Sequence, residues 1–373
     1  MTGTRRGGRP GSRGSAAQLV CVALSPSIDV TYIVPRLRPG TIHRPREVYR
    51  VPGGKGFNVA RAAQTLGADV VATGVLGGDS GAWMVAMLGR AGIRIAPVAG
   101  VQPTRTCLSI ADQAAGTLTE MYEPAPLITP RSWSTLLATV VRLCDEHPSW
   151  VSLSGSLPPG PVPEALADLV AAARSAGARV AVDTHSTTLA AAVGAGADLV
   201  KVNVQEAAAL LGSGHGTGYD DEDDPAEGHP EDIPADRARH RPADLPAHDP
   251  VALAHGLLGV SPGTGLAVVT AGAEGAVAVS RDGWALRARL DALGDYPVGS
   301  GDSFLGGLLA ALAAHPDDQQ GALRLAMGAG AANALTPGAG VLDAATAREL
   351  AARVVLEAVQ VDGGDVRSTS GSR

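Results

Sequence analysis

Aromatic residues are scarce in this chain: they make up 3% of its 373 residues, although 45% of the residues are hydrophobic. A core of that size must therefore be built from alanine, valine and leucine. Only three cysteines occur, at positions 21, 107 and 144, and they show neither a metal-ligand spacing nor a disulfide framework. Such cysteine usage fits a reducing compartment, and we expect a cytoplasmic protein.

Long apolar runs and an excess of basic residues are also missing. No run reaches the length of a membrane span, and the formal net charge is −7. A general nucleic-acid role needs a basic face and is therefore not expected, and neither is a membrane partner. The first apolar run, Gln18–Leu24, is too short for a signal-peptide core, so we interpret residues 1–17 as a disordered basic tail.

The chain is rich in glycine and proline, with 48 and 26 residues, which indicates many tight turns. Between these turns, apolar β-rich runs alternate with alanine- and leucine-rich segments of helical spacing. This alternation predicts an α/β fold with a mainly parallel sheet covered on both faces. The expected strands are Leu19–Leu24, Asp69–Val75, Trp150–Leu153, Arg179–Val182, Leu199–Val202 and Leu266–Thr270, and the expected helices are Asn58–Leu66, Ala82–Ala91, Ser132–Leu143, Glu164–Ala176 and Ala207–Leu211.

Two kinds of segment depart from this alternation. Short alternating strands are expected within residues 30–51 and 104–123, with a hairpin turn at Asp112–Gly116. They suit a small sheet that is either a lid over a cleft or an extension of the main sheet. Residues 213–249 are acidic and have little to bury, so we interpret them as a disordered insertion, and residues 359–373 as a disordered tail.

The most informative segment is Val298-Gly-Ser-Gly-Asp-Ser-Phe304, which precedes an apolar helical pattern. Backbone N–H groups of Gly299, Ser300 and Gly301 are suited to hold a migrating phosphoryl group at a helix N-terminus. Asp302 is placed to accept the proton of an attacking alcohol. The structural alternative is that Asp302 only caps the helix.

A second glycine turn, Gly53-Gly54-Lys55-Gly56-Phe57-Asn58, also opens a predicted helix. Its spacing is not that of a Walker A loop, but its lysine and asparagine are suited to hold hydroxyls or a phosphate. Asn203 and Glu206 follow a predicted strand and are three residues apart. They are suited either to orient water around Mg²⁺ or to form a capping box.

Three further features are ambiguous by themselves. The turn from Thr270 through Gly272 to Gly275 follows a buried strand and fits either a nucleotide phosphate or a plain turn. Asp29 follows the first strand, and Arg105 lies in the expected lid. A carboxylate can hold sugar hydroxyls and a guanidinium can hold a sugar phosphate, although either residue alone also fits a surface charge.

Taken in order, these motifs give the chain a resemblance to the ribokinase-like (PfkB) carbohydrate kinases over residues 18–358. Gly53–Arg61 is similar to the family's N-terminal signature, and Val298–Phe304 is similar to its C-terminal signature. Asn203–Glu206 matches its N-x-x-E motif, and Thr270–Gly275 matches its nucleotide turn. Asn58-Val-Ala-Arg61 and Ser154-Gly-Ser-Leu-Pro-Pro-Gly160 resemble the phosphofructokinase and tagatose-6-phosphate kinase branch.

The resemblance implies a three-layer α/β/α sandwich with a small β-sheet lid, and an enzyme that transfers phosphate from ATP to a phosphorylated ketohexose, most like a 1-phosphofructokinase. It implies Asp302 as the base with Gly299, Ser300 and Gly301 around the phosphoryl group, and a possible homodimer through the lid. The remaining residues that it implies are, for the sugar phosphate, Asp29, Gly53, Gly54, Lys55, Asn58 and Arg105; for ATP, Lys201, Thr270, Gly272, Gly275 and Asn333; and, for Mg²⁺ through water, Asn203 and Glu206.

Three departures from the family pattern bear on the substrate. Ser25 stands where this branch usually has asparagine, Val202 stands where the family often has proline, and the acidic insertion follows the N-x-x-E helix. Kinases of the same architecture that act on tagatose 6-phosphate, fructose 6-phosphate or a nucleoside therefore remain alternatives. So does a non-catalytic sugar-phosphate sensor, although a sensor would not need a base.

Overall fold

A computed structural model describes residues 18–162, 164–212, 249–292 and 294–359. Its centre is a ten-stranded sheet in the order β14-β13-β12-β11-β10-β9-β8-β1-β4-β5. The strands of this sheet are β1 Gln18–Ala23, β4 Asp69–Leu76, β5 Arg94–Ala99, β8 Trp150–Ser154, β9 Arg179–Asp183, β10 Leu199–Asn203, β11 Leu266–Thr270, β12 Ala276–Ser280, β13 Ala285–Arg289 and β14 Val355–Ala358. The expected tails except Val359, and the insertion except Asp249, lie outside the described residues.

The sheet is parallel from β11 to β5, as the strand–helix alternation predicts. The strands β12, β13 and β14 are antiparallel and extend one edge. Sequence patterning did not separate these three strands, because they are short: β12 and β13 are joined by a tight turn, and β14 is a mostly exposed strand of four residues. The parallel strands place their carboxyl ends along a single edge of the sheet, where open α/β sheets bind ligands.

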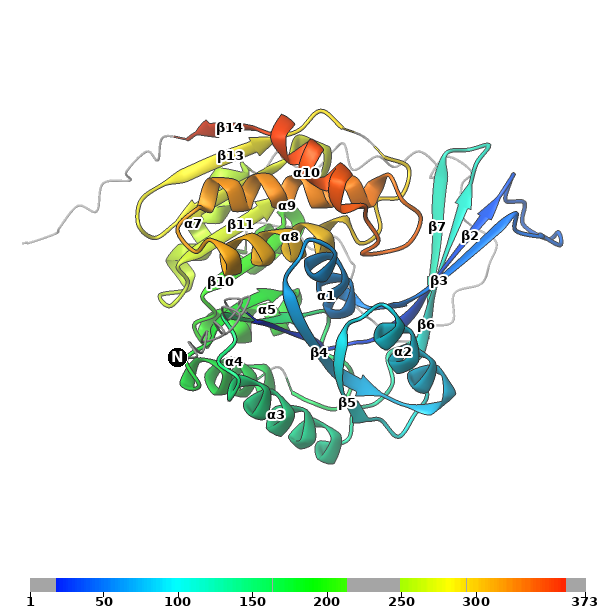
Figure 1. Ribbon diagram of the computed structural model, residues 1–373, viewed down its shortest axis with the longest axis horizontal. Coiled ribbons are helices and arrows are strands. Elements are labelled where there is room, and N and C mark those ends of the chain that lie inside the picture. The colour runs from blue at the N-terminus through cyan, green and yellow to red at the C-terminus, as the bar shows by residue number, and fades with distance from the viewer. Residues whose placement is uncertain (1–17, 163, 213–248, 293, 360–373) are drawn as a thin grey trace, which may run out of the picture.

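Helices cover both faces of the sheet and give three layers (Figure 1). One buried cluster lies beneath α1 Lys55–Thr65, α2 Gly78–Arg90, α8 Ser300–Ala314, α9 Gln319–Ala334 and α10 Ala344–Arg353. The other lies beneath α3 Pro130–Cys144, α4 Ala165–Ser175, α5 Ser186–Gly194, α6 Val204–Leu210 and α7 Pro250–Val260. This confirms the predicted sandwich.

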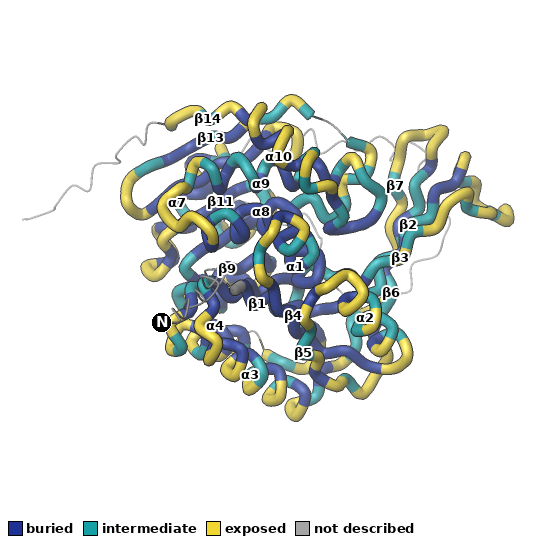
Figure 2. Tube along the Cα trace, viewed as in Figure 1, coloured by how far each residue is buried: buried dark blue, intermediate teal, exposed yellow. Residues whose placement is uncertain are grey.

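Small residues replace aromatic ones where the helices of the first face meet. A Cβ on Gly306 would lie 2.8 Å from the Val59 carbonyl oxygen of α1, and one on Gly307 would lie 2.9 Å from the Leu325 carbonyl oxygen of α9. The backbones of α1, α8 and α9 therefore approach closely, which compensates for the small side-chain volume of the core. Figure 2 shows α8, at the centre of these contacts, as mostly buried tube.

A separate four-stranded sheet projects from one side of the sandwich (Figure 1). Its order is β3-β2-β6-β7, with β2 Ser27–Val34, β3 Glu47–Gly53, β6 Arg105–Asp112 and β7 Thr117–Tyr122. The structure thus confirms the small sheet and decides against an extension of the main sheet. We call β2, β3, β6 and β7 the lid. Within the described ranges, none of the helices combines the length and apolar character needed to cross a bilayer.

Candidate functional site

The two glycine signatures meet at the carboxyl edge of the main sheet. The Asn58 side chain of α1 donates a hydrogen bond from Nδ2 to Oδ2 of Asp302 in α8, over 2.9 Å. Both side chains are buried, although 244 positions separate them in the sequence. A carboxylate and an amide from opposite ends of the chain therefore share one site, beside the N-termini of two helices.

The first turn of α8 leaves backbone donors available for an anion. Gly299 is the N-cap with φ +80°, and no side chain caps this helix. A side chain at Gly299 would be strained, and its Cβ would lie 2.6 Å from the Gly340 amide nitrogen. The Ser300 amide already donates to the Pro297 carbonyl over 3.1 Å. The amides best placed for an anion are therefore those of Gly301 and Asp302, which lack an acceptor within the helix.

Asp302 does not cap its own helix. It is the third residue of α8, and its side chain points to Asn58. Burial, together with the negative charge of Asp183, raises the pKa of Asp302 to about 6, although Lys55, Asn58 and Lys201 oppose the shift. A carboxylate with such a pKa is a stronger proton acceptor than an exposed one and remains ionised at neutral pH.

Two lysines lie on one buried aspartate that the sequence motifs did not include. Oδ2 of Asp183 is 2.8 Å from Lys201 Nζ, and Oδ1 is 3.1 Å from Lys55 Nζ. Burial disfavours the charged form of Asp183, but Lys201 and Lys55 outweigh it and lower its pKa below the usual value. The sequence carried one signal for Asp183. This residue ends β9 and Asn203 ends the next strand, β10, so both lie at the same edge of the parallel sheet.

The lysines line the space in front of α8. A Cβ on Gly301 would lie 2.9 Å from Lys201 Nζ, so the ammonium group is next to the first helical turn. Burial disfavours the charge on Lys55, but Asp183, Glu206 and Asp302 outweigh this effect and raise its pKa. Positive charge and helix amides are thus gathered around one small region that suits a phosphoryl group.

Asn203 and Glu206 form a capping box, one of the two roles for which the sequence suited them. Asn203 Oδ1 accepts from the Glu206 amide and Glu206 Oε2 accepts from the Asn203 amide, each over 2.8 Å. The second oxygen of Glu206 lies 3.7 Å from Lys55 Nζ. The cap therefore points one carboxylate oxygen towards the lysine cluster.

The predicted nucleotide residues are divided between two places. Thr270 ends β11 beside β10, and Gly272 begins the short turn Gly272–Glu274. A cavity of about 390 Å³ borders this turn at Ala271, Ala273 and Glu274. The packing of β13 explains why position 275 is a glycine: a side chain there would collide with the Ala288 carbonyl oxygen.

Asn333 lies inside α9 and is wholly buried. Its Nδ2 donates to the Val298 carbonyl over 2.8 Å, and its Oδ1 accepts from the Ser303 hydroxyl over 3.0 Å. The residue therefore fastens the turn that precedes α8 and uses its polar atoms within the protein. This geometry supports a positioning role rather than direct contact with ATP.

The lid contributes Asp29, Arg105 and Gly53 at the ends of its strands nearest the sandwich. Ser27 pairs with Gly53 of β3 and with Arg105 of β6, and its hydroxyl donates to Asp29 Oδ1 over 2.6 Å. Gly53 leaves room for the Asp29 carboxylate, which a Cβ would displace. Gly54 has φ +83°, and a Cβ there would lie 2.6 Å from the Ser25 carbonyl oxygen. Burial raises the pKa of Asp29.

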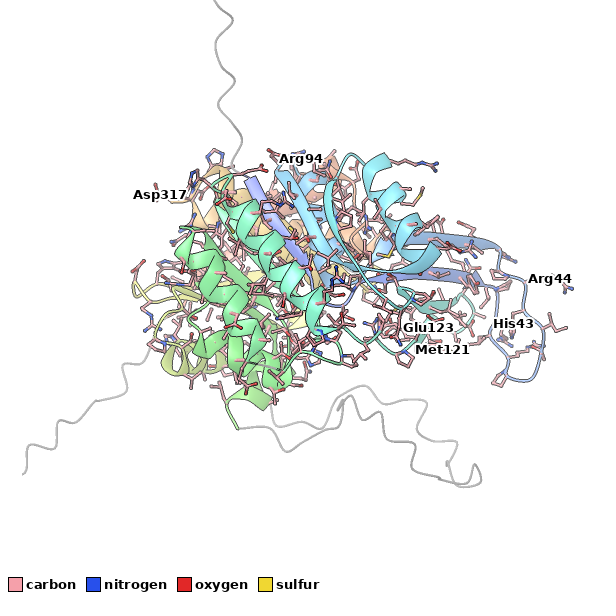
Figure 3. The ribbon with its side chains drawn as sticks, turned by 90° about the horizontal axis from the view of Figure 1, so that it is seen from below. His43, Arg44, Arg94, Met121, Glu123 and Asp317 are labelled. Carbon is pink, nitrogen blue, oxygen red and sulfur yellow. The ribbon has the colours of Figure 1, made fainter. Side chains whose placement is uncertain are left out.

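Arg105 donates from Nη1 to the Glu123 carbonyl over 3.1 Å. Its Nε is buried and has no hydrogen-bond partner among the described residues. The guanidinium therefore keeps one donor without an acceptor, and the strand register puts Arg105 on the same lid face as Asp29. Figure 3 shows Glu123 and Met121 near the base of the lid, whereas His43 and Arg44 lie at its far tip.

Comparison with known proteins agrees with these motifs. The family model described as "pfkB family carbohydrate kinase" matches residues 16–231 and 244–345. The chain is 33% identical to a 1-phosphofructokinase of Rhodobacter capsulatus over 70% of this chain and 76% of that protein. It is also 33% identical to a 1-phosphofructokinase of Xanthomonas campestris over 88% of this chain and 97% of that protein.

A solved structure supports the same assignment. Phosphofructokinase-2 from Escherichia coli in complex with potassium superposes with a TM-score of 0.75 and 26% sequence identity, covering 90% of this chain and 98% of that one. The sequence match, the fold and the meeting of the two glycine signatures at one site therefore all point to the same family. The chain belongs to the pfkB family of carbohydrate kinases.

Proposed function

We propose that this protein is an ATP-dependent 1-phosphofructokinase, which converts fructose 1-phosphate to fructose 1,6-bisphosphate. The contact between Asn58 and Asp302 carries the proposal, because it places a buried carboxylate between two glycine-rich helix starts. The two relatives named 1-phosphofructokinase support the choice of sugar phosphate. The alternative is a kinase that acts on fructose 6-phosphate or tagatose 6-phosphate. The resemblance to phosphofructokinase-2 favours this alternative over a kinase whose substrate carries no phosphate.

In this proposal, Asp302 accepts the proton of the sugar hydroxyl while the hydroxyl oxygen attacks the γ-phosphorus of ATP. The bond between the γ-phosphorus and the oxygen that bridges it to the β-phosphorus breaks, and ADP leaves. Backbone amides of Gly301 and Asp302, with the ammonium group of Lys201, stabilise the charge on the transferred group. Gly299, Ser300 and Asn333 hold the turn that aims these donors.

The sugar phosphate is assigned to the space between the lid and α1. Arg105 supplies the guanidinium for the phosphate, with its Nε donor unpartnered in the unliganded protein, and Asp29 accepts hydrogen bonds from hydroxyls. Gly53 and Gly54 allow the close turn between them, with Lys55 and Asn58 behind. Thr270 and Gly272 lie at the sheet edge assigned to ATP, where the bordering cavity gives room.

We propose Mg²⁺ as the metal that accompanies ATP. Among the residues that the structure describes, no three His, Cys, Asp or Glu side chains lie close enough to hold a metal directly. Mg²⁺ usually keeps several waters and uses one or two carboxylates with substrate phosphates. The Glu206 oxygen that faces Lys55, with the nearby Asn203, fits such a water-mediated role. When bound, the metal neutralises charge on the phosphate oxygens.

A coupled assay of ADP release tests the function. The purified protein with ATP and MgCl₂ is offered fructose 1-phosphate, fructose 6-phosphate, tagatose 6-phosphate, ribose and adenosine, and each reaction is repeated with EDTA. We expect the highest kcat/KM with fructose 1-phosphate and loss of turnover with EDTA. A higher kcat/KM with another sugar phosphate would select the alternative kinase, and binding without any turnover would indicate a sensor.

The pKa of Asp302 predicts how the rate depends on pH. A base must be unprotonated, and the pKa of Asp302 is raised to about 6 in the unliganded protein, so kcat/KM should be constant above about pH 7. Below pH 6 it should fall about tenfold per pH unit, as expected for one essential carboxylate. The measurement is kcat/KM for the sugar phosphate from pH 5 to 9, because this ratio reports the free enzyme. A flat profile down to pH 5 would exclude Asp302 as the base.

Arg105→Ala should raise KM for the sugar phosphate about 10- to 100-fold and change kcat little, because a hydrogen-bonded charge contributes about 1.5–3 kcal/mol. KM for ATP should not change. Arg44→Ala removes an arginine from the exposed far tip of the lid and serves as a matched control (Figure 3). An unchanged KM in Arg105→Ala would argue for a phosphate-free substrate.

A homodimer through the lid is the assembly that we propose. Strand register puts one row of lid side chains on the face opposite Asp29. On that face, Val48 is 44% exposed and Met121 is 52% exposed, a large apolar exposure for a small sheet. The exposed or half-buried apolar residues around them on this face include Tyr32, Leu108 and Ile110. Light scattering during size-exclusion chromatography should give the mass of a dimer.

A further inference from the structure

Arg61 lies in α1 one turn beyond Asn58, and the mechanism above gives it no role. Nη1 donates to Asn58 Oδ1 over 3.2 Å and to the Ala339 carbonyl over 2.6 Å, and Nη2 donates to the Pro52 carbonyl. These acceptors come from three separate parts of the chain. They are α1, the end of the lid strand β3, and the loop between α9 and α10.

The bond to Asn58 fixes which way that amide faces. A guanidinium only donates hydrogen bonds, so the oxygen of Asn58 must face Arg61. The amino group of Asn58 must then face Asp302, as its 2.9 Å hydrogen bond requires. If Arg61 were absent, a protonated Asp302 could instead donate to the oxygen of a turned amide, which would stabilise the inactive form of the base.

The bond to Ala339 acts on the opposite side of the site. Gly299 packs against this loop so closely that a Cβ would lie 2.7 Å from Ala339 Cα. Gly340 in turn packs on Asn58, with a Cβ position 2.7 Å from Asn58 Cα. Arg61 therefore joins the loop, the turn before α8 and the end of β3 at Pro52 into one packed unit.

We propose that Arg61 is a positioning residue for phosphoryl transfer, which orients the Asn58 amide towards the base and clamps the loop at Ala339 beside the turn before α8. This inference rests on the proposed kinase function. It assigns Arg61 no contact with the substrate or with the transferred group.

The charge of Arg61 adds an electrostatic effect. Burial lowers the pKa of Arg61 to about 10, while Asp29 and Asp302 act in the opposite direction, so the group is charged at neutral pH. Loss of the Arg61 charge should make ionisation of Asp302 less favourable.

Other charged and titratable groups also act on Asp302 or Arg61 from the surrounding elements. They are Asp29 of β2, Lys55 of α1, Asp183 of β9 and Lys201 of β10.

Arg61→Gln and Arg61→Lys test the proposal with the best substrate of the assay, from pH 5 to 9. We expect Arg61→Gln to lower kcat about 10- to 100-fold, as misplacement of a catalytic group does. We also expect the midpoint of its rate–pH profile, the pH at which the rate is half of its plateau value, to rise by about one unit. Arg61→Lys keeps the charge and should retain the wild-type midpoint, but its kcat should remain reduced, because an ammonium group cannot serve the separated acceptors.

Arg281→Gln is the matched control. Arg281 also holds carbonyl groups, those of Leu258, Ser261 and Thr264, but it follows β12 at the opposite edge of the sheet. Its loss should lower the melting temperature and leave the pH midpoint unchanged. Circular dichroism and thermal melting establish that each variant is folded. If Arg61→Gln does not fold, the Arg61→Lys variant decides the question.

Arg61→Gln with an unchanged pH midpoint and a kcat within threefold of wild type would overturn the proposal. If only Arg61→Lys folds, a wild-type kcat in that variant would do the same. Failure of the kinase function itself gives a different result, because the wild-type protein would then show no turnover with any sugar phosphate.

Discussion

Asp302→Asn should leave a folded protein whose kcat is about 10²- to 10⁴-fold below that of the wild type, the range expected for loss of a general base. An asparagine side chain has nearly the same shape and can still accept the hydrogen bond from Asn58. It cannot accept the substrate proton. KM for both substrates should stay within a few-fold, because Asp302 is assigned to the proton rather than to binding.

Stability provides a second readout for this variant. The folded-state pKa of Asp302, about 6, lies above the pKa of an unfolded aspartate, about 3.9, so its charge opposes folding at neutral pH. The variant should therefore be at least as stable as the wild type at pH 7, and its advantage should disappear below about pH 4. Low activity together with high stability distinguishes a lost base from a damaged fold.

Asp317→Asn is the control for Asp302→Asn. Asp317 is exposed in the turn between α8 and α9, away from the lid (Figure 3). Its kinetics and its unfolding should match those of the wild type. Near-wild-type turnover in Asp302→Asn would show that another group accepts the proton, and the assignment of the site would then be wrong.

Asp183→Asn should give the largest loss of stability. It removes the negative partner of two lysines, and the Lys201 side chain is only 6% exposed. Removal of one member of a buried ion pair leaves an uncompensated charge and costs about 3–5 kcal/mol. The free energy of unfolding, measured by urea titration at pH 7, should fall by that amount. Activity should fall too, because Lys201 would lose its position beside α8.

The sign of the pH dependence follows from the lowered pKa of Asp183 in the folded protein. Its stabilising contribution is present above the unfolded pKa of about 3.9 and is lost as the pH falls through the folded pKa. The difference between wild type and variant should therefore be constant from about pH 5 to 8 and shrink in acid. A constant difference down to pH 3 would show that the effect is not the loss of the aspartate charge.

Two further variants complete this experiment. Asp69→Asn breaks an ion pair with Arg94 in which both side chains are about half exposed, and it should cost less than about 1 kcal/mol. Asp183→Asn combined with Lys201→Met removes both buried charges and should recover part of the lost stability. A loss below 1 kcal/mol in Asp183→Asn alone would contradict the role assigned to this ion pair.

The sandwich and the lid were predictable because their signals are local. Buried parallel strands appear as continuous apolar runs, and the helices between them appear as periodic alanine and leucine. The antiparallel strands β12, β13 and β14 carry weaker signals, since an edge strand such as Val355–Ala358 is short and mostly exposed. Their positions depend on pairing with the rest of the sheet.

The candidate site was predictable only in part. Asp302 and Asn58 each belong to a glycine-rich helix start that is visible in the sequence. Asp183 belongs to no such motif, and Arg61, although it ends the signature that begins at Gly53, was given no role there. The importance of both residues arises from partners that are far away along the chain. Asp183 meets Lys55 across 128 positions, and Arg61 meets Ala339 across 278. No local pattern encodes these contacts.

By itself, the sequence determined that buried strands alternate with helices and which two glycine turns open a helix, because these features depend on the conformational preferences of neighbouring residues. It did not fix the helix starts: the predicted starts Asn58 and Ala82 lie inside α1 and α2, which begin at Lys55 and Gly78. Only the tertiary structure decided what each polar residue does. It assigned Asn203 and Glu206 to a cap, buried Asn333 beneath a turn, and enclosed Asp302 with Asn58. Burial and neighbouring charges set the pKa of a carboxylate, and both exist only once distant segments have packed together.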